Sequence, residues 1–219
     1  MKKKKLTIVA AIAVALTATA VAVAQGESPP DTTKGSSARI DVSQSLSQFS
    51  VLRATPDTLP EQWRTGGLAG TVDVDTSRAV AIKPPAGEKR FGSWYAVPGA
   101  QGTCFVVEDM GSCATFEQLQ TSGAVWFTTP GKNPEGVSIK DPQNQQAWEV
   151  RGIAPDGVSS VVAFGELPGG KGRGEKGIAK VEGNAFFLDL PHGADVVAFR
   201  DDRGKTVTNV SVGAWEATR

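Results

Sequence analysis

The stretch AWEVRGIAPDGVSSVVAFGELPGGKGRGEKGIAKVEGNAFFLDLPHGADVVAFRDDRGKTVTNVSV, from residue 147 to residue 212, decides the fold class of this chain. It contains six short apolar runs, at 147–152, 158–164, 177–181, 185–190, 195–200 and 206–212. Turn-forming residues separate the runs, as at 155–157, 183–184, 191–193 and 201–204. Six short strands at close spacing predict an antiparallel β-sandwich or a small barrel.

The preceding region, residues 39–130, mixes strand signals with short helical ones. Strands are expected at 79–83, 93–97, 103–108 and 124–128, with a hairpin loop at 98–102. The spacing of Leu46, Phe49 and Arg53 favours a helical turn, and short helices are also expected at 59–63 and 115–120. We therefore expect a mainly β protein with minor short helices, in which an α+β region at 39–130 packs with a β-rich region at 131–219.

The first 24 residues are expected to target the chain to the membrane. Lysines at positions 2–5 precede an uncharged run at 6–24, which ends in Ala22-Val23-Ala24. This pattern predicts a signal peptide cleaved before Gln25. The run also approaches the roughly 20 residues of a membrane-spanning helix, so an uncleaved anchor is the alternative. Either way the folded part lies outside the cytoplasm, secreted or anchored, after a flexible linker at 25–38.

The formal net charge of the full chain is zero, but the part that follows residue 24 is acidic. Without residues 1–24, 19 basic residues stand against 23 acidic ones, a net charge of −4. Binding to nucleic acid needs clustered lysine and arginine, so no nucleic-acid partner is expected. Contact with the membrane is expected only through residues 6–24.

Cys104 and Cys113 are the only cysteines in the chain. An exported protein meets an oxidising environment, where such a pair forms a disulfide. The spacing fits neither a redox CxxC motif nor a zinc site. We predict a disulfide that ties the 103–108 strand to the start of the 115–120 helix, with the two Cα atoms within about 7 Å.

No residue pattern predicts a catalytic, cofactor-binding or metal site. The single histidine, His192, lies in a turn, and no G-x-S-x-G nucleophile motif accompanies it. The segment GGKGRGEKG at 169–177 lacks the order and the strand–helix context of a phosphate loop, so a solvated hairpin tip is expected. Carboxylates in turns match no calcium loop and are expected to be solvated: Asp73, Asp75, Glu108, Asp109, Asp201 and Asp202.

The tetrapeptide VVAF occurs twice, at 161–164 and at 196–199. Both copies fall within expected strands. Two copies are too few for a repeat array. They are interpreted as two similar hairpins of one sheet.

Two short motifs resemble a family of uncharacterised exported proteins of high-GC Gram-positive bacteria. The first is F-x-V-L-R at 49–53, followed by Leu59-Pro60, and the second is R-G-I-A-P-D-G-V at 151–158. They stand in the same order around a cysteine pair, behind a hydrophobic N-terminal segment. The resemblance implies export and no known activity, so it assigns no site residues. The P-D-G-V element also has a physical interpretation, as a tight turn that leads into a strand.

The expected function is a non-catalytic binding or structural module outside the cytoplasm. It would act through contacts with an unidentified protein or cell-envelope partner, without a cofactor. The alternative is an exported hydrolase whose site assembles from residues far apart in the sequence. A cleft that holds His192 near a serine and a carboxylate would favour that alternative.

Overall fold

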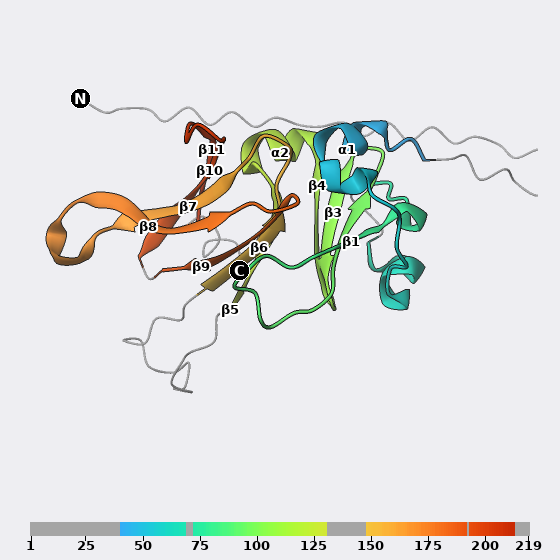
Figure 1. The fold of residues 1–219 in the computed structure, drawn as a ribbon, viewed down its shortest axis with the longest axis horizontal. Helices are drawn as coiled ribbons and strands as arrows, with labels where there is room; N and C mark the ends of the chain where they lie inside the picture. The colour runs from blue at the N-terminus through green and yellow to red at the C-terminus, as the bar shows by residue number, and fades with distance from the viewer. Residues whose placement is uncertain (1–39, 69–71, 131–147, 192, 213–219) are drawn as a thin grey trace, which may run out of the picture. The chain divides into compact units, whose positions relative to one another are not determined.

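The structure is a computed structural model that describes residues 40–68, 72–130, 148–191 and 193–212. These residues belong to one compact unit, Arg39–Arg219. The targeting segment 1–24 and the linker 25–38 lie outside the described residues. The prediction of a mainly β fold with a few short helices is confirmed (Figure 1).

The strands form three antiparallel sheets. The first sheet has the order β1-β2-β3-β4, with β1 at Val80–Ile82, β2 at Trp94–Pro98, β3 at Gly102–Val107 and β4 at Met110–Thr115. The central sheet has the order β5-β6-β9, with β5 at Val125–Pro130, β6 at Trp148–Ile153 and β9 at Ala185–Leu190. The outer sheet has the order β11-β10-β7-β8, with β7 at Ser160–Glu166, β8 at Arg173–Lys180, β10 at Ala194–Arg200 and β11 at Thr206–Ser211.

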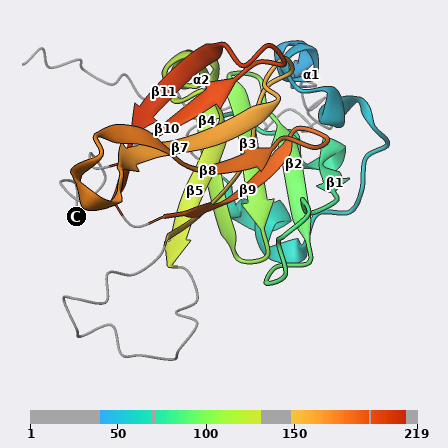
Figure 2. The ribbon, with the colours of Figure 1, turned by 60° about the vertical axis from the view of Figure 1, so that its left-hand side comes forward.

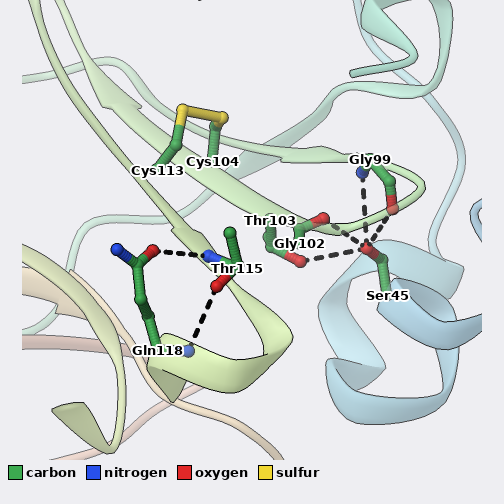
Figure 3. The surroundings of a disulfide bond; sticks show 8 residues. All are labelled: Ser45, Gly99, Gly102, Thr103, Cys104, Cys113, Thr115 and Gln118. Atoms are coloured by element: carbon green, nitrogen blue, oxygen red, sulfur yellow. Dashed lines mark hydrogen bonds between the residues drawn. A yellow bond between two sulfur atoms is a disulfide. The ribbon is translucent and has the colours of Figure 1, made fainter. Parts of the chain in front are cut away.

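Short helices connect and cover the sheets. The α-helices are α1 at Ser43–Gln48 and α2 at Phe116–Ser122. Single helical turns are η1 at Ser50–Arg53, η2 at Trp63–Gly67, η3 at Thr76–Arg78 and η4 at Pro168–Gly170. Thr115 caps α2 through a reciprocal pair of hydrogen bonds with Gln118, as expected for a helix that begins there (Figure 3).

The three sheets stack like a sandwich with an extra layer, and the central sheet is buried on both faces. Val125 and Ile153 face the first sheet, in a core with Trp94 and Phe105. The alternate residues of the same strands, such as Val150, face the outer sheet. Figures 1 and 2 show the first sheet in green and the outer sheet in orange and red. Since β5 pairs with β6, the regions 39–130 and 131–219 share one sheet.

Cys104 and Cys113 form the predicted disulfide, with Cα atoms 4.0 Å apart (Figure 3). Its surroundings differ from the prediction. Cys113 lies in β4, directly opposite Cys104 of β3, and not in a loop before a helix. Cys104 is fully buried beneath the segment that contains Leu59 and Val72. The bridge therefore staples two paired strands together.

Ser45 of α1 attaches this N-terminal helix to the hairpin between β2 and β3. Its hydroxyl is fully buried and lies 2.9 and 2.8 Å from the backbone oxygens of Gly99 and Gly102, which share its single hydrogen (Figure 3). It also accepts from the Thr103 hydroxyl at 3.1 Å. A buried hydroxyl requires such partners, so the contact fixes the position of α1 on the first sheet.

The two VVAF copies belong to two hairpins of one sheet, as the sequence suggested. The first copy lies on β7 of the β7–β8 hairpin and the second on β10 of the β10–β11 hairpin. The two copies also pair with each other. The antiparallel register places Val161 opposite Phe199, and Phe164 opposite Val196. The repeated tetrapeptide therefore forms a locally two-fold symmetric contact.

Candidate functional site

The most unusual polar group of the fold lies on the face of the central sheet that points toward the first sheet. Cross-strand pairing arranges this face in rows. Arg151 of β6 stands between Phe127 of β5 and Phe187 of β9. Glu149 stands in the next row, between Thr129 and Asp189. A charged row thus follows directly on the apolar core, which places ionic groups where burial is costly.

The Arg151 side chain has no exposed surface, and all three of its guanidinium nitrogens donate within the protein. Nε donates to Glu88, one terminal nitrogen to the Thr129 hydroxyl and the other to Glu149. The guanidinium carbon lies 4.7 Å from the Phe91 ring centroid and 4.9 Å from that of Phe187. Arginine suits this position because its planar group donates in several directions and stacks on aromatic rings.

A strap, defined as residues 83–93 between β1 and β2, closes over this cluster. The Glu88 side chain is only 1% exposed and reaches Arg151 from the strap. The Arg90 guanidinium donates to the backbone oxygen of Pro130 at 2.8 Å and lies 3.5 Å from Glu149. Phe91 covers Arg151. The ionic contacts therefore join the edge of the first sheet to the central sheet.

The cluster carries three carboxylates, on Glu88, Glu149 and Asp189, against the guanidinium groups of Arg90 and Arg151. Asp189 is exposed, in contrast to the other two acids. Partial burial is the main factor that raises the pKa of Asp189 above 3.8, and repulsion by Glu149 and Glu88 adds to it, while Arg151 opposes the shift. When Asp189 ionises, its carboxylate therefore repels those of Glu149 and Glu88 and lowers the stability of the cluster.

We expect Asp189→Asn to raise stability slightly at neutral pH. Because its pKa is raised in the folded state, that state binds more protons than the unfolded state between pH 3.8 and the raised value, so stability falls as the pH rises through this window. The amide does not ionise, so the variant avoids this loss of stability. The expected gain is less than about 1 kcal/mol because solvent screens the site. Urea unfolding at pH 7 and pH 3 measures it, and the gain should vanish at pH 3. Asp202→Asn, in the turn after β10, is the control. An equal gain at both pH values would contradict the prediction.

A second polar cluster joins the two motifs that carry the family resemblance. Asp156 of the P-D-G-V turn accepts from the Ser50 backbone at 2.8 Å, from Asn184 at 2.9 Å and from Arg53 at 3.0 Å. Asn184 in turn accepts from the backbone of Val51 at 2.8 Å. Partial burial acts to raise the pKa of Asp156, but the hydrogen bonds from Asn184, Ser50 and Arg53 outweigh it and hold that pKa below 3.8. The two motifs therefore form one structural contact between η1 and the central sheet.

The sites considered in the sequence are dispersed in the structure. His192 lies outside the described residues. Asp75 caps η3 through its bond from the Ser77 backbone, and Asp201 accepts from two backbone groups of the turn after β10. Glu108 and Asp109 form the turn between β3 and β4, and Asp73, Asp202 and the other turn acids do not join the Arg151 cluster. In the 169–177 segment, strands flank the tip as expected, but β8 begins already at Arg173.

The sequence did not predict that Arg151, Glu88 and Glu149 form a group. The only available signal was a pair of charges two residues apart, Glu149 and Arg151, inside an expected strand. Such alternation is typical of the solvated face of a sheet. Only the burial of both faces of the central sheet makes these charges unusual.

Comparisons with protein-family models, with curated proteins and with solved structures found no match. The resemblance to exported proteins of high-GC Gram-positive bacteria stays a prediction. Within the described ranges, no three histidine, cysteine or acidic side chains lie close enough together to hold a metal ion. None of the helices in those ranges has the length and hydropathy of a membrane span. The disulfide fits an oxidising, extracytoplasmic compartment.

Proposed function

We propose that this protein is an extracytoplasmic module of the cell envelope that binds or holds a partner without chemical catalysis. The observation that carries the proposal is the state of the Arg151 cluster. Its guanidinium nitrogens are all engaged with Glu88, Glu149 and Thr129, and the strap covers them. Ionic groups arranged in this way stabilise a fold and are not free to take part in a reaction. The Cys104–Cys113 disulfide supports a location outside the cytoplasm.

An exported hydrolase is the second candidate, and one observation favours it. Glu149 and Asp189 stand directly opposite each other on β6 and β9, and Asp189 is exposed with a raised pKa. Glycoside hydrolases use a pair of carboxyl groups as acid and base. Glu149 is engaged with Arg151, however, which supports the structural role over this one.

The proposal is tested by mixing the purified exported protein with isolated cell envelopes. A binding module should co-sediment with the envelopes in a saturable manner and leave the supernatant unchanged in mass spectrometry. Time-dependent release of soluble sugars or peptides, abolished by Glu149→Gln and by Asp189→Asn, would establish the hydrolase instead. Failure to co-sediment at any protein concentration would refute the envelope-binding role.

We further expect the mature chain to begin at or near Gln25, because a small-x-small site precedes that residue. Mass spectrometry of the exported protein measures its terminus directly. A chain recovered from the membrane fraction with its lysines at positions 2–5 intact would establish the anchor in place of cleavage. Either result would locate the folded unit outside the cytoplasm, whereas full-length protein confined to the cytoplasm would contradict both.

A further inference from the structure

Strand β11 forms one border of the outer sheet, and its outward edge is unpaired. Within the described residues β11 forms a ladder with β10 alone, and no strand follows it in the order of the sheet. Figures 1 and 2 show β11 in dark red at this border. A border strand with free N–H and C=O groups can pair with a strand of another chain, so natural sheets usually protect such edges.

The pairing with β10 shows which backbone groups of β11 point outward. The N–H of Val212 donates to the backbone oxygen of Asp195 at 2.7 Å, so Val212 directs its backbone groups toward β10. Antiparallel pairing alternates this direction along a strand, so Val210 also faces β10. The backbone groups of Asn209 and Ser211 therefore point away from the sheet, and in the described part of the chain they have no hydrogen-bond partner.

A bulge limits the regular edge to residues 208–212. The ladder with β10 shifts its register between Phe199 and Arg200, which leaves Val207 of β11 without a residue opposite it. A bulge interrupts the regular spacing of backbone hydrogen bonds and twists the strand. A partner strand can therefore form a ladder only along the half of β11 that follows the bulge.

This edge carries no charged side chain. Residues 206–212 read TVTNVSV, whereas β8 at the other border of the same sheet carries Arg173, Glu175, Lys176 and Lys180. Charges of this kind protect an edge from pairing. Two copies of one chain carry equal charges, so their strands pair most readily where no charge is present. The neutral edge of β11 therefore favours a second copy of this chain as the partner.

A two-fold axis at Val210, perpendicular to the sheet, gives matched residue pairs. Asn209 then lies opposite Ser211 of the second copy, and the outward backbone groups of both residues find partners. The Ser211 hydroxyl donates to the backbone oxygen of Asp195 at 3.4 Å, so its oxygen can still accept from the Asn209 amide. On the inner face Val210 meets its own copy. Val210 and Val212 are only partly buried at the border of the core, so this contact covers apolar surface.

Helix α2 leaves room for the second copy. The Thr208 hydroxyl donates to the backbone oxygen of Thr121 at 3.3 Å. A Cβ atom placed on Gly123 would meet both Thr208 and the core residue Phe199, so the end of α2 lies under the inner face and not beside the edge. The axis places Thr208 opposite Val212 of the second copy, so the two α2 contacts are about 13 Å apart along the strand. Packed helices need only about 8–10 Å.

We propose that two copies of this protein pair through their β11 edges and form an antiparallel, two-fold symmetric dimer with one continuous outer sheet. Each copy uses this edge once, so the assembly closes at the dimer. A contact along one short strand is small, and the dimer should therefore form at roughly micromolar or higher protein concentration. The inference goes beyond the proposed envelope-binding function and does not depend on it.

Sedimentation velocity of the purified exported protein, from about 1 μM to about 1 mM, should show a change from monomer to dimer. Asn209→Pro should weaken the dimer at least about tenfold, because it removes an outward N–H and keeps the hydrogen bonds to β10. Asn209→Ala is the matched control. It keeps this N–H and should dimerise within about threefold of the native protein. Circular dichroism should show the native β fold in both variants.

A charge exchange tests the same contact without proline. The double variants Asn209→Glu with Ser211→Glu, and Asn209→Lys with Ser211→Lys, place like charges across the axis, so each alone should stay monomeric. An equimolar mixture of the two should form a dimer, which a role of these residues within a single chain would not produce. The proposal is overturned if the native protein stays monomeric, if natively folded Asn209→Pro dimerises like the native protein, or if the mixture stays monomeric.

Discussion

Arg151→Met is expected to destabilise the protein by about 3–5 kcal/mol. Methionine is similar in length, but it removes the guanidinium that donates to the buried carboxylates of Glu88 and Glu149, and leaves only Arg90, 3.5 Å from Glu149, as a cationic neighbour. It also removes the cation that stacks between Phe91 and Phe187. Because these charges are almost entirely shielded from solvent, added salt should change the loss very little. Urea unfolding at neutral pH, followed by tryptophan fluorescence, measures the difference.

Two further variants separate this effect from simple loss of an arginine. Arg200→Met removes an arginine whose side chain is 22% exposed, pairs with the exposed Glu175 and lies over the Phe164 ring, and it should cost less than Arg151→Met because no buried carboxylate loses its partner. Combining Arg151→Met with Glu88→Leu and Glu149→Leu removes the whole ionic group, and it should recover most of the stability. If Arg151→Met alone stays within about 1 kcal/mol of the native protein, the cluster does not hold the strap in place.

The strands could be predicted where local chemistry alone decides them. The expected run at 185–190 coincides with β9, because its apolar residues stand between the Gly183-Asn184 turn and a proline. Asn184 has a φ of +65°, a conformation that asparagine tolerates better than most residues. The hairpin of β2 and β3 was predicted in the same way, from two apolar runs with turn-forming residues between them.

Strands were missed where tertiary contacts decide the conformation. β4 has the sequence MGSCAT, whose small and polar residues have weak strand propensity. It is extended because it pairs with β3 along six residue pairs and is bridged through Cys113. The early start of β8 has a similar origin, because Arg173 pairs with Glu166 of β7 in spite of the neighbouring glycines.

The ionic cluster could not be predicted because its partners are far apart in the sequence. Glu88 and Arg151 are separated by 63 residues. Glu88 lies in no motif, and the R-G-I-A-P-D-G-V motif that begins at Arg151 does not indicate its burial. Glutamate in a loop or arginine in a strand is usually solvated. Glu88 and Arg151 come together only because three sheets stack on one another. The periodicity of single strands cannot predict this stacking. The two resembling motifs are a similar case, because only the fold shows that Arg53 contacts Asp156.

The Cys104–Cys113 bridge is the other contact with a large expected effect. Replacing both cysteines with alanine should cost about 2–3 kcal/mol, the loop-closure entropy of so short a segment. The β fold should persist, because three apolar clusters surround the sheets and only one of them contains the bridge. Circular dichroism should therefore be unchanged while the urea midpoint falls.

Reduction provides the matched control for this variant. A thiol-free phosphine reductant should lower the urea midpoint of the native protein toward that of the double alanine variant and leave the variant itself unaffected. Thiol titration of the native protein, unfolded without reductant, should find no free thiol, because the bridge occupies both cysteines. Two reactive thiols per chain would show that the bridge does not form. If the fully reduced native protein kept its urea midpoint while the alanine variant lost stability, the loss would come from packing around Cys104, which is fully buried, and not from the cross-link.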